Sequence, residues 1–284
     1  MRRDYARRVK DFNGMNQIMV DIKPNRSVSD VFINQKMDVT NLMKYLDKKK
    51  KKGEHITFFH AILTAVGKLY HNRPLLNRFI QNRHIFEHKY VDIAFVAKVA
   101  FDDKAEEVQI IIRVDDEDTI DSISKKVQDK IDYFRKSKEF KKEGANNLID
   151  VLGHQPNIVR VPIMNLLVWM DKKGILPRSI AKDNFYYSSI GLSNLGSLHS
   201  GAILHNIADF GNASALATIG EVKDEEVLIN GKKEVRKLCE FGVNLDERIA
   251  DGYYFVKSLH MLQYIFDNPE LLEGPANEKI KFKE

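Results

Sequence analysis

The sequence predicts an α/β fold in which helices flank a mixed β-sheet. Amphipathic helix patterns and strand patterns alternate through the first half of the chain. Strand patterns then dominate, and one helix pattern closes the sequence. No internal repeat or linker-like stretch interrupts this order. Elements in such an order favour a single domain with helices packed on a sheet.

The composition is that of a globular protein. The chain has 284 residues, of which 43% are hydrophobic and 30% are charged, so it is long enough to bury a large core. The net charge of +5 permits an anionic ligand but gives no reason to expect nucleic acid as a partner. Cys239 is the only cysteine. A single cysteine excludes an internal disulfide framework and a cysteine-rich zinc site, and it favours a protein of the reducing cytoplasm.

No segment has the pattern of a membrane span or a secretory leader. The most apolar run, residues 161–170, is about half the length that a spanning helix needs. The arginines at positions 2, 3, 7 and 8 are not followed by an apolar region. We therefore expect a cytoplasmic protein that does not depend on a membrane surface.

The first half of the chain predicts helices capped by polar residues. An irregular basic arm over residues 1–30 precedes a strand over residues 31–39. The helix that follows ends in lysines 48–52, which suit the negative end of a helix dipole. Thr57 can cap a second helix that runs to about Tyr70. Three strands and a long charged helix are then expected over residues 78–86, 91–101, 108–114 and 119–142.

The second half returns to strands after an insertion-like region of about residues 145–184. This region contains an apolar helix with Trp169, whose apolar face we expect protein rather than a membrane surface to cover. Asn230-Gly231 between alternating stretches is typical of a β-hairpin. Further strands are expected over residues 186–193, 214–222 and 235–245, and a last helix over residues 251–266, before a loose tail over residues 273–284.

Three blocks in a fixed order resemble a known family. They are T-F-F-H-A-I-L-T-A-V-G-K-L-Y-H-N-R-P-L-L-N-R-F-I at residues 57–80, S-N-L-G at 193–196 with A-T-I-G-E-V at 217–222, and D-E-R-I-A-D-G at 246–252 with D-N-P-E-L-L at 267–272. Together they resemble the catalytic domain of the dihydrolipoyl acyltransferases of 2-oxo acid dehydrogenase complexes. That family shares its fold with chloramphenicol acetyltransferase, and the resemblance covers roughly residues 30–272.

The resemblance implies a two-layer, chloramphenicol acetyltransferase-like sandwich that assembles as a homotrimer. It implies active sites between subunits, coenzyme A or acyl-CoA as a substrate, and no metal. The match begins about 30 residues into the chain. We therefore expect no lipoyl domain and no covalently attached lipoyl group here. A lipoyl-bearing or other acyl-acceptor partner would be a separate chain.

One position departs from the family's motif. The family has D-H-R-x-x-D-G, whose histidine is the general base, and this sequence has Glu247 there, with Asp246, Arg248, Asp251 and Gly252 matching. A carboxylate is about two pKa units less basic than an imidazole, which adds on the order of 3 kcal/mol to proton transfer from a thiol. Burial could raise the pKa of Glu247 and recover part of this. We expect weak or altered acyltransferase activity, or else a non-catalytic trimeric scaffold or acyl-CoA-binding protein.

Other candidate site residues follow from the same resemblance. Ser193 matches the serine that donates a hydrogen bond to the oxyanion, although S-N-L-G, with Asn194, could equally be only a strand-to-loop exit. His199 and His205 follow in an uncharged loop and are alternative bases.

Three further residues are expected to be structural. In the family the aspartate at position 251 pairs with an arginine, for which Arg8 and Arg26 are the candidates here. Asp251 could also cap the last helix. His60 and Cys239 lie among apolar residues, where core packing is the expected role.

Overall fold

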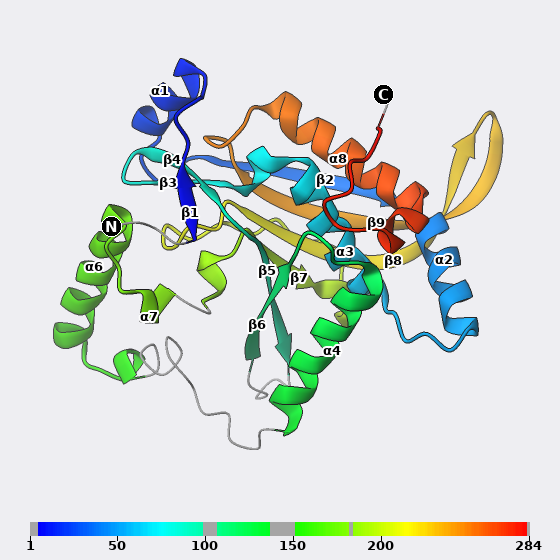
Figure 1. The fold of residues 1–284 in the computed structure, drawn as a ribbon, viewed down its shortest axis with the longest axis horizontal. Coiled ribbons are helices and arrows are strands. Elements are labelled where there is room, and N and C mark those ends of the chain that lie inside the picture. Colours follow the sequence, from blue (N-terminus) through cyan, green and yellow to red (C-terminus); the bar gives the residue numbers. More distant parts are fainter. Residues whose placement is uncertain (1–4, 99–106, 137–150, 182–183, 283–284) are drawn as a thin grey trace.

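A six-stranded mixed sheet is the frame on which the described part of the chain is built (Figure 1). The computed structural model describes residues 5–98, 107–136, 151–181 and 184–282. The sheet contains, in spatial order, β2 (Asp30–Asp38), β9 (Lys232–Asp246), β8 (Ala215–Ile229), β7 (Ile190–Asn194), β5 (Val91–Lys98) and β6 (Glu107–Val114). The β5–β7 and β7–β8 pairs are parallel and the other three pairs are antiparallel. The predicted α/β fold with a mixed sheet is confirmed.

Four helices pack around one face of this sheet and bury the main core. They are α2 (Thr40–Lys51), α3 (Phe58–Asn72), α4 (Ile120–Lys136) and α8 (Gly252–Asp267). Lysines 48–51 occupy the last turn of α2, as the sequence predicts. The hairpin at Asn230-Gly231 is also confirmed, and both residues have positive φ angles of 50° and 78°. The ends of the helix expected to reach residue 142 and of the strand expected to reach 101 lie outside the described residues.

Helix α3 begins where the sequence predicts. The Oγ1 atom of Thr57 accepts a hydrogen bond from the backbone N of His60 at 3.2 Å, which satisfies a donor that has no partner inside the helix. Every residue from His60 to Tyr70 is buried. A helix that is buried on all sides needs neighbours on all sides.

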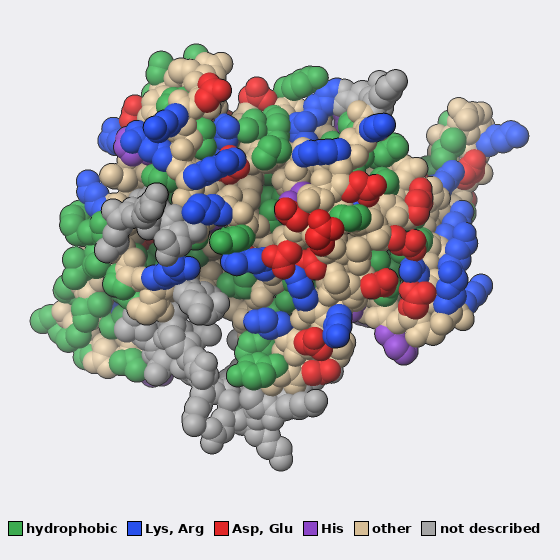
Figure 2. Space-filling view, in the orientation of Figure 1, with side chains coloured by type: hydrophobic (Ala, Val, Ile, Leu, Met, Phe, Trp, Pro, Cys, Tyr) green, Lys and Arg blue, Asp and Glu red, His purple; other side chains and the backbone are tan. Residues whose placement is uncertain are grey.

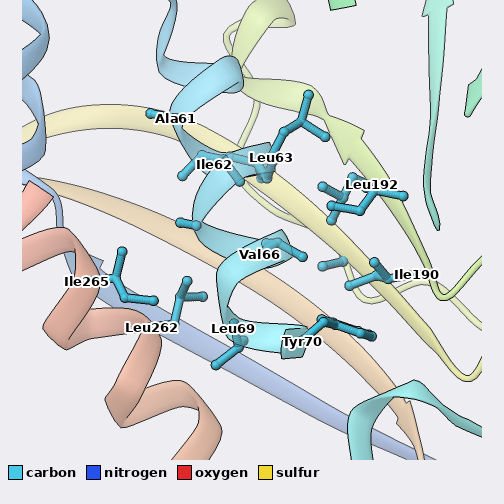
Figure 3. Close-up of a cluster of buried hydrophobic side chains, with 14 of the residues drawn as sticks. Ala61, Ile62, Leu63, Val66, Leu69, Tyr70, Ile190, Leu192, Leu262 and Ile265 are labelled. Carbon is cyan, nitrogen blue, oxygen red and sulfur yellow. The ribbon is translucent and has the colours of Figure 1, made fainter. Parts of the chain in front are cut away.

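Figure 3 shows these neighbours. Ile190 and Leu192 of β7 lie on one side of α3, and Leu262 and Ile265 of α8 lie on the other. Helix α3 is therefore sandwiched between the sheet and α8, which explains why its sequence is apolar around its whole circumference.

A small second sheet corrects two of the expectations. It contains β1 (Ala6–Arg8), β4 (His84–His88) and β3 (Arg78–Gln81) in that order. The single strand expected over residues 78–86 is wrong, because Asn82 and Arg83 turn the chain with φ angles of 49° and 58° and pair β3 with β4. The N-terminal arm is not irregular either. It contains β1 and a helix, α1 (Gly14–Ile22), whose first turn is capped by the side chain of Asn13.

The C-terminal tail is held rather than loose over the residues that the structure describes. The chain passes through a short 3-10 helix, η4 (Pro269–Glu273). The buried Nζ of Lys68 then donates to the carbonyl oxygens of Gly274 and Pro275, at 3.3 and 2.7 Å, and to the carboxylate of Glu278 at 3.1 Å. A buried ammonium needs such acceptors, so the tail completes the environment of α3.

The insertion-like region forms a long helix, α6 (Asn157–Lys173), and a short one, α7 (Arg178–Ala181). Only Asp171 of α6 is buried. Within this chain most of the apolar surface of α6 is exposed, so cover by protein, which stays a prediction, would have to come from a second copy or another partner. Before β7, a short 3-10 helix, η2 (Phe185–Tyr187), replaces the start of the strand expected at residue 186.

Shortening a side chain in α3 tests the packing of the core. Leu63 is 0% exposed, so Leu63→Ala should leave a cavity and lower the free energy of unfolding by about 2–5 kcal/mol in urea titrations. Val235 on the β8–β9 hairpin is 65% exposed, and Val235→Ala serves as the control with a change of about 0.5 kcal/mol or less. Equal effects of the two substitutions would contradict this packing.

Candidate active site

Glu247 lies directly after the end of β9 and is held in an ion pair. Its backbone N donates to the carbonyl of Ser29 at 3.0 Å, which fixes the chain at this point. Its Oε1 atom accepts a hydrogen bond from Nζ of Lys23, the residue that caps the C-terminus of α1. Both side chains are about one-third exposed, at 28% and 32%. The Glu247 side chain is thus reachable from solvent but engaged by an ammonium group.

A buried charge network lies beneath this pair. Asp246 is 0% exposed and accepts two hydrogen bonds from the guanidinium of Arg248, at 2.8 and 2.6 Å, in the bidentate arrangement that suits this group. Arg248 also donates to the carbonyl oxygen of Lys23 at 2.9 Å. Arg26 approaches the same carboxylate at 3.9 Å. The network therefore fixes the backbone of Lys23, and with it the partner of Glu247.

Arg26 also holds the loop that follows the S-N-L-G motif. Its guanidinium donates to the carbonyl oxygens of Ala208 at 2.6 Å and of Gly211 at 2.9 Å. Burial lowers the pKa of Arg26, while the carboxylate of Asp246 acts in the opposite direction. A buried guanidinium needs acceptors for its N–H groups, and here the loop supplies them.

The insertion reaches the same loop through Asp171. One carboxylate oxygen accepts from the hydroxyl of Tyr187 at 2.5 Å, and the other accepts from the backbone N of Gly211 at 2.9 Å. Burial raises the pKa of Asp171, although both hydrogen bonds act against that shift. Asp171 and Arg26 thus hold opposite sides of Gly211, so α6 is tied to the loop at the site. No local sequence pattern indicates this link, because Asp171 lies 40 residues before Gly211 in the chain.

Asp251 has the capping role that was one of its two expected roles. Its carboxylate accepts from the backbone N of Tyr254 at 2.8 Å at the start of α8, whose first residue is Gly252. Arg26 lies beside Asp246 instead, and Arg8 contacts a histidine on β4, so neither candidate arginine pairs with Asp251 in this chain.

Ser193 lies near the end of β7, on the face of the sheet that the helices do not cover. It pairs in register with Thr218 of β8, which pairs with Gly242 of β9. Directly paired residues point to the same face, and the neighbouring Leu192 belongs to the core on the other face. The hydroxyl of Thr218 exchanges hydrogen bonds with the backbone of Ile203, so the loop runs over the face to which Ser193 belongs.

One chain does not bring Ser193 and Glu247 together. Glu247 is five residues beyond Gly242, the residue of β9 that is level with Ser193. At the usual strand rise and spacing, this places the two Cα atoms roughly 19 Å apart. An acyl-transfer site that uses both residues therefore needs a second copy of the chain.

The two candidate histidines of the loop contact near neighbours. Nδ1 of His199 lies 2.7 Å from the carboxylate of Glu221, and the His199 side chain is 85% exposed. Nδ1 of His205 lies 2.8 Å from the carbonyl oxygen of Asn206. These contacts do not place either ring beside Ser193 or Glu247.

His60 and Cys239 have the packing roles that their sequence surroundings predict. His60 completes the cap of α3 with Thr57, and burial lowers its pKa. Cys239 is fully buried, and burial raises the pKa of its thiol to about 12. Such a thiol holds its proton at neutral pH and is a poor nucleophile.

A pocket of about 710 Å³ opens beside the S-N-L-G motif, on the helix side of the sheet. Its walls come from the start of α3, from α4 and from the motif; they include His55, Phe58, Gln128, Ile131, Asn194, Gly196, Ser197 and Val222. Gly196 lies against Gly220, and a Cβ at Gly196 would be 2.5 Å from the carbonyl oxygen of Gly220. The two glycine-containing blocks of the sequence therefore meet at this pocket. No local sequence pattern indicates that meeting.

The family of the chain is shown by its amino-terminal part. Residues 8–166, more than half of the chain, match the model of the 2-oxoacid dehydrogenases acyltransferase (catalytic domain) family. The chain belongs to this family. The matched region ends before Ser193 and Glu247, so the assignment does not depend on the substituted motif. No curated protein sequence matches the chain significantly.

Solved structures of this acyltransferase family share the fold. A probable dihydrolipoamide acetyltransferase from Listeria monocytogenes has a TM-score of 0.60 and 18% identity, over 92% of this chain and 95% of that chain. The truncated catalytic core of the 2-oxoacid dehydrogenase complex from Thermoplasma acidophilum has a TM-score of 0.58 and 16% identity, over 93% and 99%. Chloramphenicol acetyltransferase has a TM-score of 0.52 and 12% identity, over 93% and 98%. The expected chloramphenicol acetyltransferase-like fold is confirmed.

Two kinds of feature are absent from the described residues. No group of three or more His, Cys, Asp or Glu side chains among them is arranged to hold a metal ion. No helix in the described ranges is both long and apolar enough to cross a bilayer.

The buried histidine beneath the loop gives a pH prediction. Nε2 of His88 lies 3.4 Å from the carbonyl oxygen of Asn212, and burial lowers the pKa of His88 to about 4. An unfolded histidine titrates at about 6.5, so the unfolded chain takes up this proton first as the pH falls. The free energy of unfolding should therefore decrease between pH 6.5 and about 4, by on the order of 3 kcal/mol from this residue.

The variant His88→Gln isolates this contribution from that of the carboxyl groups. Urea titrations across the pH window should show a shallower decrease for the variant than for the natural sequence. Parallel curves for the two proteins would mean that His88 does not stay neutral in the folded state.

Proposed function

We propose that the chain is a CoA-dependent acyltransferase-family protein whose activity is weak or altered because Glu247 replaces the base. The observation that carries the proposal is the ion pair between Glu247 and Lys23. A general base needs a free lone pair aimed at the proton it takes. Here one carboxylate oxygen already accepts from an ammonium group. A carboxylate is already a weaker base than an imidazole, and this ion pair makes Glu247 a weaker base still.

The substrates in this proposal are coenzyme A or an acyl-CoA and an acyl acceptor. The acceptor is a lipoyl-bearing or other thiol partner, as the resemblance implies. Ser193 is the donor to the oxyanion. Asp246, Arg248, Asp251 and Gly252 are structural, since they anchor the turn that carries Glu247 and start α8. The single buried cysteine supports a reducing, cytoplasmic setting.

A second copy supplies the other half of the site in this proposal. Exposed apolar side chains surround the Glu247 end; they are Ile22, Val28, Phe32 and Tyr253. A different set lies in the loop over the Ser193 face, namely Leu198, Ile203 and Leu204. A contact between two unlike surfaces is heterologous, and such contacts form a ring when the rotation between copies closes and an open filament when it does not. A closed ring of three copies is compatible with such a contact, and the resemblance implies that number.

The alternative is a non-catalytic trimeric scaffold or an acyl-CoA-binding protein. The same ion pair favours it, because Lys23 and Glu247 stabilise each other without any chemistry. The two functions differ in turnover but not in assembly, so the assembly and the chemistry need separate tests.

Light scattering tests the assembly. At micromolar concentration the chain should have the mass of a trimer, about three times 32.8 kDa. Leu204→Asp should lower that mass, since it places a charge in the contact opposite Glu247. Leu228→Asp on the hairpin, where the leucine is 72% exposed, is the control and should leave the mass unchanged. A monomer in the natural sequence would refute the shared site.

Restoring the base tests the chemistry. Acetyl transfer from acetyl-CoA to a dithiol should be very slow in the natural sequence. Glu247→His should raise it, by up to about 10²–10⁴-fold, because an imidazole can hold a thiol proton at neutral pH. Ser193→Ala in that background should lower it again by about 10²–10³-fold. The measurement is thiol release together with calorimetry of CoA binding.

Glu247→Gln is the matched control, because it removes the charge and supplies no base. It should leave transfer as slow as in the natural sequence. If the natural sequence is highly active and Glu247→Gln does not change that activity, His199 or His205 would be the general base instead. CoA binding without any gain from Glu247→His would favour the scaffold or binding function.

A further inference from the structure

The first part of α6 projects from the molecule with apolar side chains on several sides. Figure 2 shows hydrophobic side chains gathered over this helix, at the lower left of the view. Residues 157–159 and 161–166 are all exposed. The large apolar side chains among the exposed residues of α6 are Ile158 at 85%, Val159, Val161, Ile163, Met164, Leu166 and Trp169 at 52%. Contiguous exposed apolar surface of this kind marks an interaction site.

The other end of α6 is fixed to the body of the protein. The backbone carbonyl of Asp171 accepts from the side chain of Gln81 at 3.0 Å, and the carbonyl of Lys172 accepts from the backbone N of Asn82 at 3.1 Å. Nζ of Lys172 donates to the side chain of Asn25 at 3.2 Å. The exposed turns are therefore held in one direction by contacts at the base of the helix.

The described residues of the insertion are mostly basic where they are charged. Over residues 151–181 the only acidic residue is Asp171, which is buried and hydrogen-bonded, whereas Asp and Glu make up 40 of the 284 residues overall. The same stretch has four basic residues, Arg160, Lys172, Lys173 and Arg178. Lysine is depleted from the centres of protein interfaces, but it is enriched beside apolar helices that bind anionic lipid.

We propose that α6 docks the protein on an anionic lipid surface, with the apolar turns inserted and the basic base of the helix, at Lys172 and Lys173, facing the headgroups. The shape of the surface favours this occupant. A groove on another protein covers one side of a helix, whereas acyl chains surround a projecting one. The turns from Asn157 to Leu166 are about 15 Å long, enough to reach the 5–10 Å depth at which interfacial helices lie. This surface shares no residue with the two surfaces assigned to the trimer contact.

Trp169 is the only tryptophan, so its fluorescence reports on this surface without a label. In solution the emission should be that of a water-exposed indole. Vesicles of phosphatidylcholine with phosphatidylglycerol should shift it to shorter wavelength, and brominated lipid should quench it. Phosphatidylcholine alone should have little effect, and added salt should weaken the response because it screens the basic residues. An emission already at short wavelength before lipid is added would mean that protein covers the helix.

Co-sedimentation with the same vesicles separates the apolar and charged contributions. The double variant Ile158→Asp with Leu166→Asp should lose binding. Lys173→Gln, which leaves the contact between Lys172 and Asn25 intact, should weaken it about fivefold. The matched control is Leu228→Asp with Val235→Asp on the β8–β9 hairpin, which should bind as the natural sequence does.

Three results would overturn the proposal. They are absence of binding to the anionic vesicles, binding that persists in Ile158→Asp with Leu166→Asp, and a lower mass of that variant in light scattering without lipid. The last result would assign the helix to a contact between copies of the chain. Circular dichroism of each variant checks that it is folded, and all the substituted apolar residues are exposed.

Discussion

The arrangement of the site depends on the buried guanidinium of Arg26. Its two terminal nitrogens donate to carbonyl oxygens of the loop, at Ala208 and Gly211, and its Nε lies 3.9 Å from the carboxylate of Asp246. Removing one partner from such a network leaves a buried charge unmatched, which is strongly destabilising. The contacts of Arg26 join the loop to the end of β9, and Asp171, which binds the same Gly211, joins the base of α6 to that loop. The position of Glu247 depends on the buried carboxylate of Asp246 next to it and on its own ion pair with Lys23.

The sequence was most informative where local rules and burial agree. The cap at Thr57, the lysines that end α2 and the Asn-Gly hairpin were all predicted, because each depends on residues a few positions apart. The errors came where a local pattern had two solutions. Residues 78–86 alternate well enough for one strand, but Asn82 and Arg83 accept positive φ angles and turn the chain back. The tail looked loose because its anchor, Lys68, lies about 200 residues earlier in the sequence.

The site was less predictable than the fold. Asp246, Arg248, Asp251 and Gly252 were found from a motif, and the structure gives Asp251 its capping role. The partners of the motif could not be found in this way. Lys23 is more than 220 residues from Glu247, and no spacing rule joins them. The contact between Gly196 and Gly220 could not be predicted for the same reason. The two sequence blocks that contain these glycines meet only when β7 and β8 align.

The position of Asp171 gives the inserted helix a consequence for energy as well as for shape. The carboxylate of Asp171 and the guanidinium of Arg26 both bind Gly211, and Arg26 approaches the residue next to Glu247. A ligand that displaces α6 must therefore change the free energy of the loop, and one that displaces the loop must change that of α6. Linkage requires the two effects to be equal. The insertion and the site are in this sense one thermodynamic unit, although the chain separates them by some 75 residues.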